Sequence, residues 1–558
     1  MNTLFTLSLV IQILLFLIVT GVVGQTDKKP NVLIILADDV GTENVPGWGN
    51  EIVDMPNIRA LQEKGVTFMD AHSTSLCAPS RYMLLSGNFP HRGTLPFGTW
   101  DINRKGQSQF YGRQKSIASM MKTGGYRTSM FGKWHIGGGL PGTFDRDKFL
   151  SSQDWENGRL LNGPRDHGFD DSFYSVSGIQ AAPYAFFRNG KLVGKEDEIE
   201  YWEKGEHISL AGNDIEILRS GEGMIHWDST LYNKKIFRKA EKFLDNHIDN
   251  HPDMPWFMYF ALGSVHIPHT PPDNYFNGTK VAGKYGDPHL DLLYEMDLII
   301  GSLLKKLEET NQIEDTIIIF TSDNGGLNMN NPNPLLRGYK GSMYEGGHRV
   351  PFVMRYDNVL PAGEIRNEHF ISLADIYATI GDFIDVTIDE YSAQDSKSFM
   401  EYAVSSSANP PRTYLPVYRH QNKKGKHQAA MRYGNYKFIR DYHLKWEALY
   451  NLKDDIGEKQ NLLSTDFQTY NTLRKKLRNK LRKDGLCPVD RTHTFQLKNG
   501  KRSSETVNCS FFETNTESKC YWQPIGEIMC NSFCGRHRKF CKLWESSDAE
   551  FPVDFLDK

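Results

Sequence analysis

Cysteine is scarce over most of the sequence. Of the seven cysteines in 558 residues, only Cys77 lies before residue 480. The others crowd the C-terminal end: Cys487, Cys509, Cys520, Cys530, Cys534 and Cys541. An even number of cysteines in a short tail predicts a framework of intramolecular disulfides, whose pairing the sequence does not choose. Cys77 is left over and needs a separate explanation.

Neither sign of charge is in large excess. Lysine and arginine number 65 against 68 aspartates and glutamates, for a net charge of -3. The electrostatic footprint of a dedicated nucleic-acid-binding protein is therefore missing, and we expect no nucleic-acid partner. Apolar residues make up 39% of the chain and charged residues 24%, which excludes wholesale disorder. The length predicts at least two packed units.

Beyond residue 24 the sequence lacks any apolar run long enough to cross a membrane. Residues 4–23 are nearly all apolar and are followed by a polar run, which predicts a signal peptide over residues 1–24, with a retained membrane anchor as the alternative. We therefore expect the secretory pathway, with the protein either secreted or lysosomal. That setting favours disulfides in the tail and N-glycosylation at the sequons of Asn277 and Asn508.

Three short, continuously apolar runs predict strands that are buried on both faces: residues 31–37, 256–261 and 316–321. Apolar residues recur at helical spacing over residues 292–307 and again over 371–380. Strands that alternate with helices predict an α/β domain over residues 25–400, with helices on both faces of the sheet. In such sheets, ligands bind beyond the carboxyl ends of the strands.

A polar stretch near residue 400 predicts the start of a second unit. Strand-like segments at 414–419 and 436–440, with a basic helix over 470–483, predict a smaller α+β domain over residues 401–486. Residues 487–558 then form a cysteine-rich extension.

Acidic and amide side chains follow two of the predicted strands. Asp38 and Asp39 come directly after the first strand, and Asp323 and Asn324 closely follow the strand at 316–321. Such residues often only begin a turn. Together, three carboxylates and one amide oxygen make the hard-oxygen ligand set of Ca²⁺ or Mg²⁺.

Two longer motifs surround the unpaired cysteine and a later lysine. Residues 77–87 read C-A-P-S-R-Y-M-L-L-S-G, and residues 125–135 read G-Y-R-T-S-M-F-G-K-W-H. The first resembles the C-x-P-S-R sulfatase motif, and the second resembles another motif of the same family. The chain is thus similar to the formylglycine-dependent, arylsulfatase-like sulfatases. The resemblance implies an alkaline-phosphatase-like fold, with a mixed, mostly parallel sheet between helices.

The resemblance also implies roles for individual residues. The metal ligands would be Asp38, Asp39, Cys77, Asp323 and Asn324, and the catalytic residues Cys77, Arg81, Lys133, His135, His269 and Lys340. His266 is a close rival of His269. The implied ion is Ca²⁺, with Mg²⁺ possible. A formylglycine-generating enzyme would oxidise Cys77 to formylglycine, whose hydrate carries two hydroxyls, one to attack sulfur and one to release sulfate.

The substrate is less defined by the sequence. The resemblance implies a sulfated small molecule or glycan, and we expect its specificity to depend on loops such as 89–100 and 174–184. A phosphate or phosphonate ester hydrolase of the same superfamily and a non-catalytic secreted glycan-binding relative are the alternatives. The chain departs from the family at Ile456, where proline is usual, and in its cysteine-rich tail. The sequence leaves the oligomeric state open.

Overall fold

The computed structural model describes residues 28–49, 52–94, 106–139, 149–152, 154–327, 335–421, 426–441 and 446–483, with short strands at 493–496, 502–505, 512–514 and 517–519. The expected signal peptide, Asn508 and the tail cysteines lie outside these residues. Among the described residues, no helix combines the length and the apolar character needed to span a bilayer. Contacts divide the chain into two units, residues 1–88 with 99–412 and residues 89–98 with 413–558.

The larger unit is built on a mixed ten-stranded sheet of order β16-β2-β15-β13-β1-β12-β4-β5-β6-β7. Its five central strands run parallel: β13 (Thr316–Ser322), β1 (Asn31–Ala37), β12 (Trp256–Ala261), β4 (Arg127–Lys133) and β5 (Asp171–Ser175). Flanking strands complete the sheet: β16 (Glu364–Arg366), β2 (Val66–Phe68), β15 (Phe352–Arg355), β6 (Phe187–Arg188) and β7 (Lys191–Leu192). β15 and the β6–β7 hairpin are antiparallel to their neighbours. The expected mostly parallel α/β sheet is confirmed.

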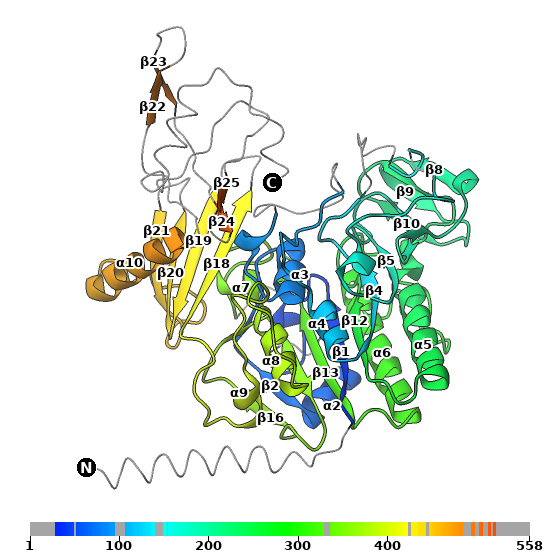
Figure 1. Ribbon diagram of the computed structural model, residues 1–558, viewed down its shortest axis with the longest axis horizontal. Helices are drawn as coiled ribbons and strands as arrows, with labels where there is room; N and C mark the ends of the chain where they lie inside the picture. The colour runs from blue at the N-terminus through cyan, green and yellow to red at the C-terminus, as the bar shows by residue number, and fades with distance from the viewer. Residues whose placement is uncertain are drawn as a thin grey trace. The chain divides into compact units, whose positions relative to one another are not determined.

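Helices cover both faces of this sheet (Figure 1). One layer contains α2 (Pro56–Lys64), α5 (Tyr232–Asn250) and α6 (Pro288–Glu309), and the other contains α3 (Cys77–Ser86), α4 (Ile117–Thr123) and α8 (Asp375–Phe383). Because both faces are covered, every residue of β1, β12 and β13 is buried. This burial explains why these strands are continuously apolar rather than alternating in the sequence.

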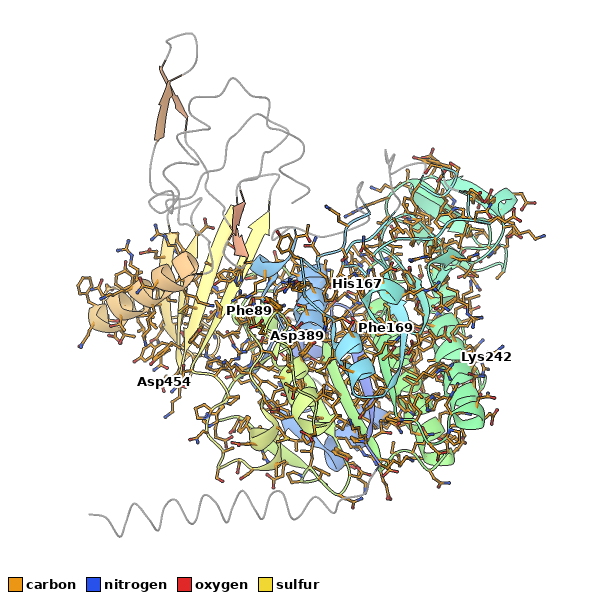
Figure 2. All side chains as sticks on the ribbon, viewed as in Figure 1. Phe89, His167, Phe169, Lys242, Asp389 and Asp454 are labelled. Carbon is orange, nitrogen blue, oxygen red and sulfur yellow. The ribbon has the colours of Figure 1, made fainter. Side chains whose placement is uncertain are left out.

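Alternate residues of the central strands contribute to the core between the sheet and the α2–α5–α6 layer. Leu33 and Ile35 of β1 join Ile318 and Phe320 of β13 in one apolar cluster with these helices. Alternate residues of a strand point to opposite faces, so the neighbouring positions serve the other layer. Side chains fill the space between the layers, while Lys242 marks the exposed outer side of α5 (Figure 2).

Small sheets and short helices complete the larger unit. β3 (Ala71–His72) lies between β14 (Arg349–Val350) and β17 (Ile371–Ser372). Two hairpin-like pairs join β8 (Ile199–Trp202) to β11 (Gly221–Met224) and β9 (Gly205–Ile208) to β10 (Asp214–Ile217). α7 (Glu345–His348) and α9 (Met400–Val404) are single short turns of helix.

The helix expected over residues 371–380 begins later than its periodicity predicts. Ile371 and Ser372 form β17, and α8 starts at Asp375. Asp375 accepts hydrogen bonds from the Ser372 backbone at 2.9 Å and from Arg412 Nε at 2.7 Å. This buried ion pair ties Arg412 to α8 of the larger unit, and the contacts divide the chain after Arg412.

Among its described residues, the smaller unit contains a four-stranded antiparallel sheet and the helix α10. Its strands are β18 (Tyr414–Gln421), β19 (Lys426–Tyr433), β20 (Tyr436–Asp441) and β21 (Trp446–Asn451), and its helix is α10 (Phe467–Lys483). Leu473 and Leu477 on one side of α10 pack with Phe438 and Leu449 of the sheet. Arg474 and Lys475, next to these leucines in the chain, are exposed, as the polar side of an amphipathic helix requires.

Candidate active site

The carboxyl ends of three parallel strands bring the predicted polar residues together. Asp38 and Asp39 follow β1, Asp323 and Asn324 follow β13, and Lys133 ends β4. The Asp323 backbone N–H donates to the Ala37 carbonyl at 3.1 Å, and the Asp39 N–H donates to Asp323 Oδ1 at 3.2 Å. Residues nearly 300 positions apart in the chain thus form one buried site.

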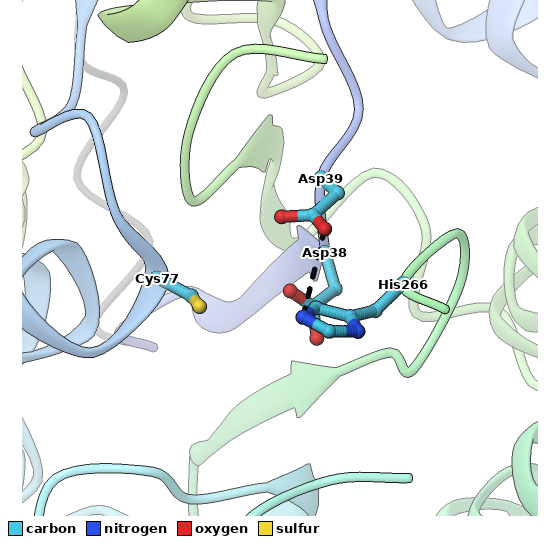
Figure 3. A group of neighbouring side chains, drawn as sticks. All are labelled: Asp38, Asp39, Cys77 and His266. Carbon is cyan, nitrogen blue, oxygen red and sulfur yellow. Dashed lines mark ion pairs between the residues drawn. The ribbon is translucent and has the colours of Figure 1, made fainter. Parts of the chain in front are cut away.

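Cys77 is the first residue of α3 and faces this site (Figure 3). Cys77, Asp38, Asp39 and His266 each offer a ligand atom, and these atoms all lie within 4.8 Å of one another. Burial raises the pKa of the Cys77 thiol, but the nearby Lys133 and Lys340 and a hydrogen bond with His266 outweigh it and lower the pKa to about 7. The structure therefore places the unpaired cysteine where an anion is stabilised.

The oxygen-rich part of the site fits a hard cation. Asp38 Oδ1 and Asn324 Oδ1 are buried and have no hydrogen-bond partner among the described residues. A buried oxygen without a partner costs free energy unless another ligand satisfies it. Burial and the neighbouring Asp38 raise the pKa of Asp323 well above its ordinary value, a repulsion between carboxylates that a divalent cation offsets. The donor set Asp38, Asp39, Asp323 and Asn324 therefore fits Ca²⁺.

Two lysines bring positive charge to the carboxylates. Lys133 Nζ lies 2.5 Å from Asp38 Oδ2, and Lys340 Nζ lies 2.6 Å from Asp39 Oδ1. Burial opposes ionisation of Asp38 and Asp39, but these lysines hold the pKa of each carboxyl below its ordinary value. The Lys340 side chain keeps 17% of its surface exposed, so it stands between the buried site and solvent.

Arg81 hydrogen-bonds two of the segments that form the site. It lies one helical turn after Cys77 and is completely buried. Its Nε and Nη2 donate to Asp323 Oδ2 at 2.9 and 2.7 Å, and its Nη1 donates to the Lys133 carbonyl at 2.9 Å. Arg81 is one of the predicted catalytic residues, and the structure directs its guanidinium to a carboxylate and a backbone carbonyl. Arg81 is therefore placed to position Asp323 and Lys133.

Two histidines compete for one predicted role. His266 Nε2 lies 3.6 Å from Asp39 Oδ2, and His266 hydrogen-bonds with the Cys77 side chain. His269 Nε2 is 3.0 Å from the Val265 carbonyl, and its ring packs against that of His289. The geometry thus brings His266 into the cluster with Cys77, in place of the preferred His269. Sequence spacing did not separate the two because both lie in one short loop.

His135 is fixed by its backbone. The residue has a positive φ of 55°, and its N–H donates to the Val176 carbonyl at 2.8 Å. Its ring is buried. His135 therefore lies two residues after Lys133, with its backbone hydrogen-bonded to the segment that follows β5.

A buried polar network that the sequence did not reveal joins two segments next to predicted catalytic residues. His72 Nδ1 lies 3.0 Å from His348 Nδ1, and His72 Nε2 lies 2.7 Å from Asp70 Oδ1. Arg349 closes the network through ion pairs with Asp70 at 3.3 Å and Glu345 at 3.1 Å. The network connects the strand before Cys77 with the helix after Lys340.

A buried nucleophile beside carboxylates and lysines, at the carboxyl edge of an alkaline-phosphatase-like sheet, defines a hydrolase of charged esters. A family model described as Sulfatase matches residues 30–386, and one described as N-sulphoglucosamine sulphohydrolase, C-terminal, matches residues 339–485. The first spans more than half of the chain. This chain belongs to the sulfatase family and is a sulfuric ester hydrolase.

Individual relatives agree with this family. An N-acetylgalactosamine-6-O-sulfatase of Bacteroides thetaiotaomicron is 28% identical over 499 residues, 79% of this chain and 90% of that protein. An arylsulfatase of Hemicentrotus pulcherrimus is 27% identical over 446 residues, 76% of this chain and 72% of that protein. A solved Bacteroides thetaiotaomicron structure from work on the metabolism of multiple glycosaminoglycans has a TM-score of 0.67 at 25% identity, covering 81% of this chain and 99% of its own.

Proposed function

We propose that this chain hydrolyses sulfate monoesters of carbohydrate or aryl alcohols, with residue 77 as a formylglycine nucleophile and Ca²⁺ as the metal. The observation that carries the proposal is the arrangement of Cys77 within 4.8 Å of Asp38, Asp39 and His266. Lys133 and Lys340 flank the same carboxylates. This arrangement supports attack by an anionic oxygen on an anionic ester, because the surrounding cations offset their repulsion.

Asp38, Asp39, Asp323 and Asn324 would hold the Ca²⁺. When bound, the ion polarises sulfate oxygens and favours ionisation of the nucleophile. The two partnerless oxygens, Asp38 Oδ1 and Asn324 Oδ1, support this assignment because they otherwise stay unsatisfied. Arg81 keeps Asp323 oriented toward the site through its two hydrogen bonds.

Residue 77 needs a modification for turnover. Conversion of cysteine to formylglycine replaces a carbon–sulfur bond by a carbonyl, an oxidation that a formylglycine-generating enzyme in the secretory pathway would perform. The aldehyde hydrate supplies two hydroxyls, one for attack on sulfur and one whose deprotonation expels sulfate as the carbonyl re-forms. The C-A-P-S-R motif at 77–81 supports this modification.

The other residues bind charge and move protons. Lys133 Nζ and Lys340 Nζ would donate to the sulfate oxygens, which carry growing negative charge in the transition state. His266 Nε2 faces the site beside Asp39, so it would protonate the departing alcohol oxygen. His135 would accept the proton of the second hydroxyl of residue 77.

Two other functions are less well supported. A phosphate or phosphonate ester hydrolase could use a similar cage of metal ligands and lysines, but C-x-P-S-R favours sulfate. A non-catalytic glycan-binding relative would not need a competent residue at each predicted position, and here Cys77, Lys133, His266 and Lys340 are all present around one site. We propose residence in the secretory pathway from the N-terminal apolar run.

Mass spectrometry of the peptide that contains residue 77 tests the proposal most directly. The protein is purified from cells that contain the formylglycine-generating machinery, and the peptide is expected to carry an aldehyde. Hydrolysis of 4-nitrophenyl sulfate is measured on the same sample, before and after chelation of Ca²⁺ and its restoration. An unmodified thiol in a fully active protein, or faster hydrolysis of 4-nitrophenyl phosphate than of the sulfate, would contradict the proposal.

A further inference from the structure

The loop after β5 is attached directly to the catalytic lysine segment. The Trp134 N–H donates to the Ser175 carbonyl at 3.0 Å, and the His135 N–H donates to the Val176 carbonyl at 2.8 Å. These bonds continue the pairing of β4 with β5 past the end of the sheet. Side chains in the first residues of this loop are therefore held at a set distance from Lys133.

Gly178 brings one of these side chains against Lys133. Its φ is +77°, a conformation that favours glycine. A methyl group at this position would lie 2.6 Å from Gln180 Oε1 and 2.8 Å from Lys133 Cδ. The Gln180 amide oxygen and the Lys133 side chain thus both lie directly beside Gly178, and a side chain at residue 178 would displace one of them.

The amide oxygen of Gln180 is buried without a partner among the described residues. Only 7% of the residue is exposed, and its Oε1 makes no hydrogen bond within the described residues. A buried amide oxygen without a partner is unfavourable, and in native proteins it indicates a water or a ligand that supplies the missing bond.

We propose that Gln180 binds a hydroxyl or amide group of the substrate beside its sulfate, so that the preferred substrate is a carbohydrate sulfate rather than a simple aryl sulfate. This inference rests on the proposed function, since Lys133 must face the sulfate. A sugar carries hydroxyl groups on the carbons next to the sulfated one, and a hydroxyl can both donate to and accept from an amide. A phenyl ring offers neither, and would leave the buried amide unsatisfied.

The test compares two substrate types in one variant. Gln180→Leu keeps the side-chain size but removes both amide hydrogen-bonding groups. Steady-state kinetics are measured with a panel of N-acetylhexosamines monosulfated at different positions, and with 4-nitrophenyl sulfate. For the best sugar substrate, kcat/KM is expected to fall about tenfold to hundredfold, the loss that follows an unpaired buried polar contact. For 4-nitrophenyl sulfate, the change is expected to stay within about twofold.

Controls separate this inference from the proposed function and from misfolding. Gln62→Leu removes an amide from α2, where Gln62 hydrogen-bonds the Pro46 carbonyl, and it should leave the ratio of the two activities unchanged. Gln180→Asn, which shortens the reach by one methylene, should reproduce the selective loss if the leucine variant does not fold. Wild-type protein inactive on every sulfate would refute the proposed function. Wild-type protein active on aryl sulfate but on no sugar sulfate would overturn this inference alone. Equal losses of activity on both substrate types would also overturn this inference. No loss on either substrate type would overturn it as well, and would show that only water hydrogen-bonds Gln180.

Discussion

Each buried charge at the centre of the site has a neighbour of opposite sign. Lys133 pairs with Asp38, Lys340 with Asp39, and Arg81 with Asp323. Burial of an unpaired charge would cost several kcal/mol, so removal of one partner affects both stability and chemistry. Individual side chains in this cluster therefore cannot be replaced independently.

Replacement of Asp39 tests the metal site. In Asp39→Ala one ligand is lost, so Ca²⁺ affinity measured by calorimetry should fall, and kcat on 4-nitrophenyl sulfate should fall at least about 100-fold. The matched control is Asp297→Asn, a buried carboxyl on α6 that accepts hydrogen bonds from Asn57 and Ile58. That variant should lose stability but keep Ca²⁺ binding. A folded Asp39→Ala variant with full activity would remove Asp39 from the ligand set.

Replacement of Cys77 separates sulfur attack from release. Cys77→Ser has one hydroxyl, so it could be sulfated once but could not expel sulfate by re-forming a carbonyl. We expect no steady-state turnover on 4-nitrophenyl sulfate and a peptide heavier by one sulfate in the mass spectrum. Cys77→Ala should show neither turnover nor adduct. A serine variant that turns over at the wild-type rate would rule out the aldehyde mechanism.

The principal helices and strands follow from local sequence where burial is uniform. The runs 31–37 and 256–261 predict β1 and β12 to the residue, because a strand covered on both faces must be apolar throughout. β19 and β21 were not predicted, since K-H-Q-A-A-M-R-Y and W-E-A-L-Y-N carry no clear periodicity. Their structure comes from pairing with β18 and β20, an interaction between segments that local pattern does not encode.

The contact between α5 and α6 predicts a pH-dependent stability. Glu295 of α6 accepts a hydrogen bond from Asn233 Nδ2 of α5 at 2.9 Å, and Asn233 Oδ1 accepts one from the Gly263 N–H at 3.0 Å. Burial raises the pKa of Glu295 to about 7 from an ordinary 4.5, despite the opposing effect of the Asn233 bond. The folded state therefore keeps this proton to a higher pH than the unfolded state does.

The free energy of unfolding should accordingly fall as pH rises from about 4.5 to about 7, by roughly 3 kcal/mol from this group. Below that window both states are protonated, and above it both are ionised, so the contribution is constant. Glu295→Gln mimics the protonated form and should lose this part of the pH dependence. Urea unfolding of both proteins at pH 5 and pH 7.5, at fixed Ca²⁺, measures the difference. If the free energy of unfolding changes equally between pH 5 and pH 7.5 in both proteins, the raised pKa of Glu295 is contradicted.

Every predicted catalytic and metal-binding residue lies in the larger of the two units. The units are not simple consecutive segments, because residues 89–98 group with the C-terminal unit. No local pattern in the sequence marks this exchange. It results from contacts within the smaller unit, such as the packing of the His91 and Tyr418 rings.

The expected secretory route predicts glycosylation at Asn277. Its side chain is exposed, and it lies in a turn where its Oδ1 accepts a hydrogen bond from the Thr279 N–H at 3.0 Å. Protein from secretory cells should lose mass on treatment with an N-glycosidase, and Asn277→Gln should lose one glycan without loss of activity. Asn311→Gln, which alters an asparagine outside any sequon, is the control and should leave glycan mass unchanged. Absence of any N-glycan would argue against this route.

The sequence by itself determined the family, the central strands and the identity of most charged residues in the site. Motif spacing and continuous apolar runs, which come from burial on both faces, can be recognised within short stretches of sequence. The tertiary structure decided which of those residues act together. It brought His266, in place of His269, toward Cys77. It directed Arg81 to Asp323 and joined His72 to His348. It also placed Gln180 beside Lys133. These relations depend on distances between segments far apart in the chain, and such distances are set by the packing and register of the sheet rather than by neighbouring residues.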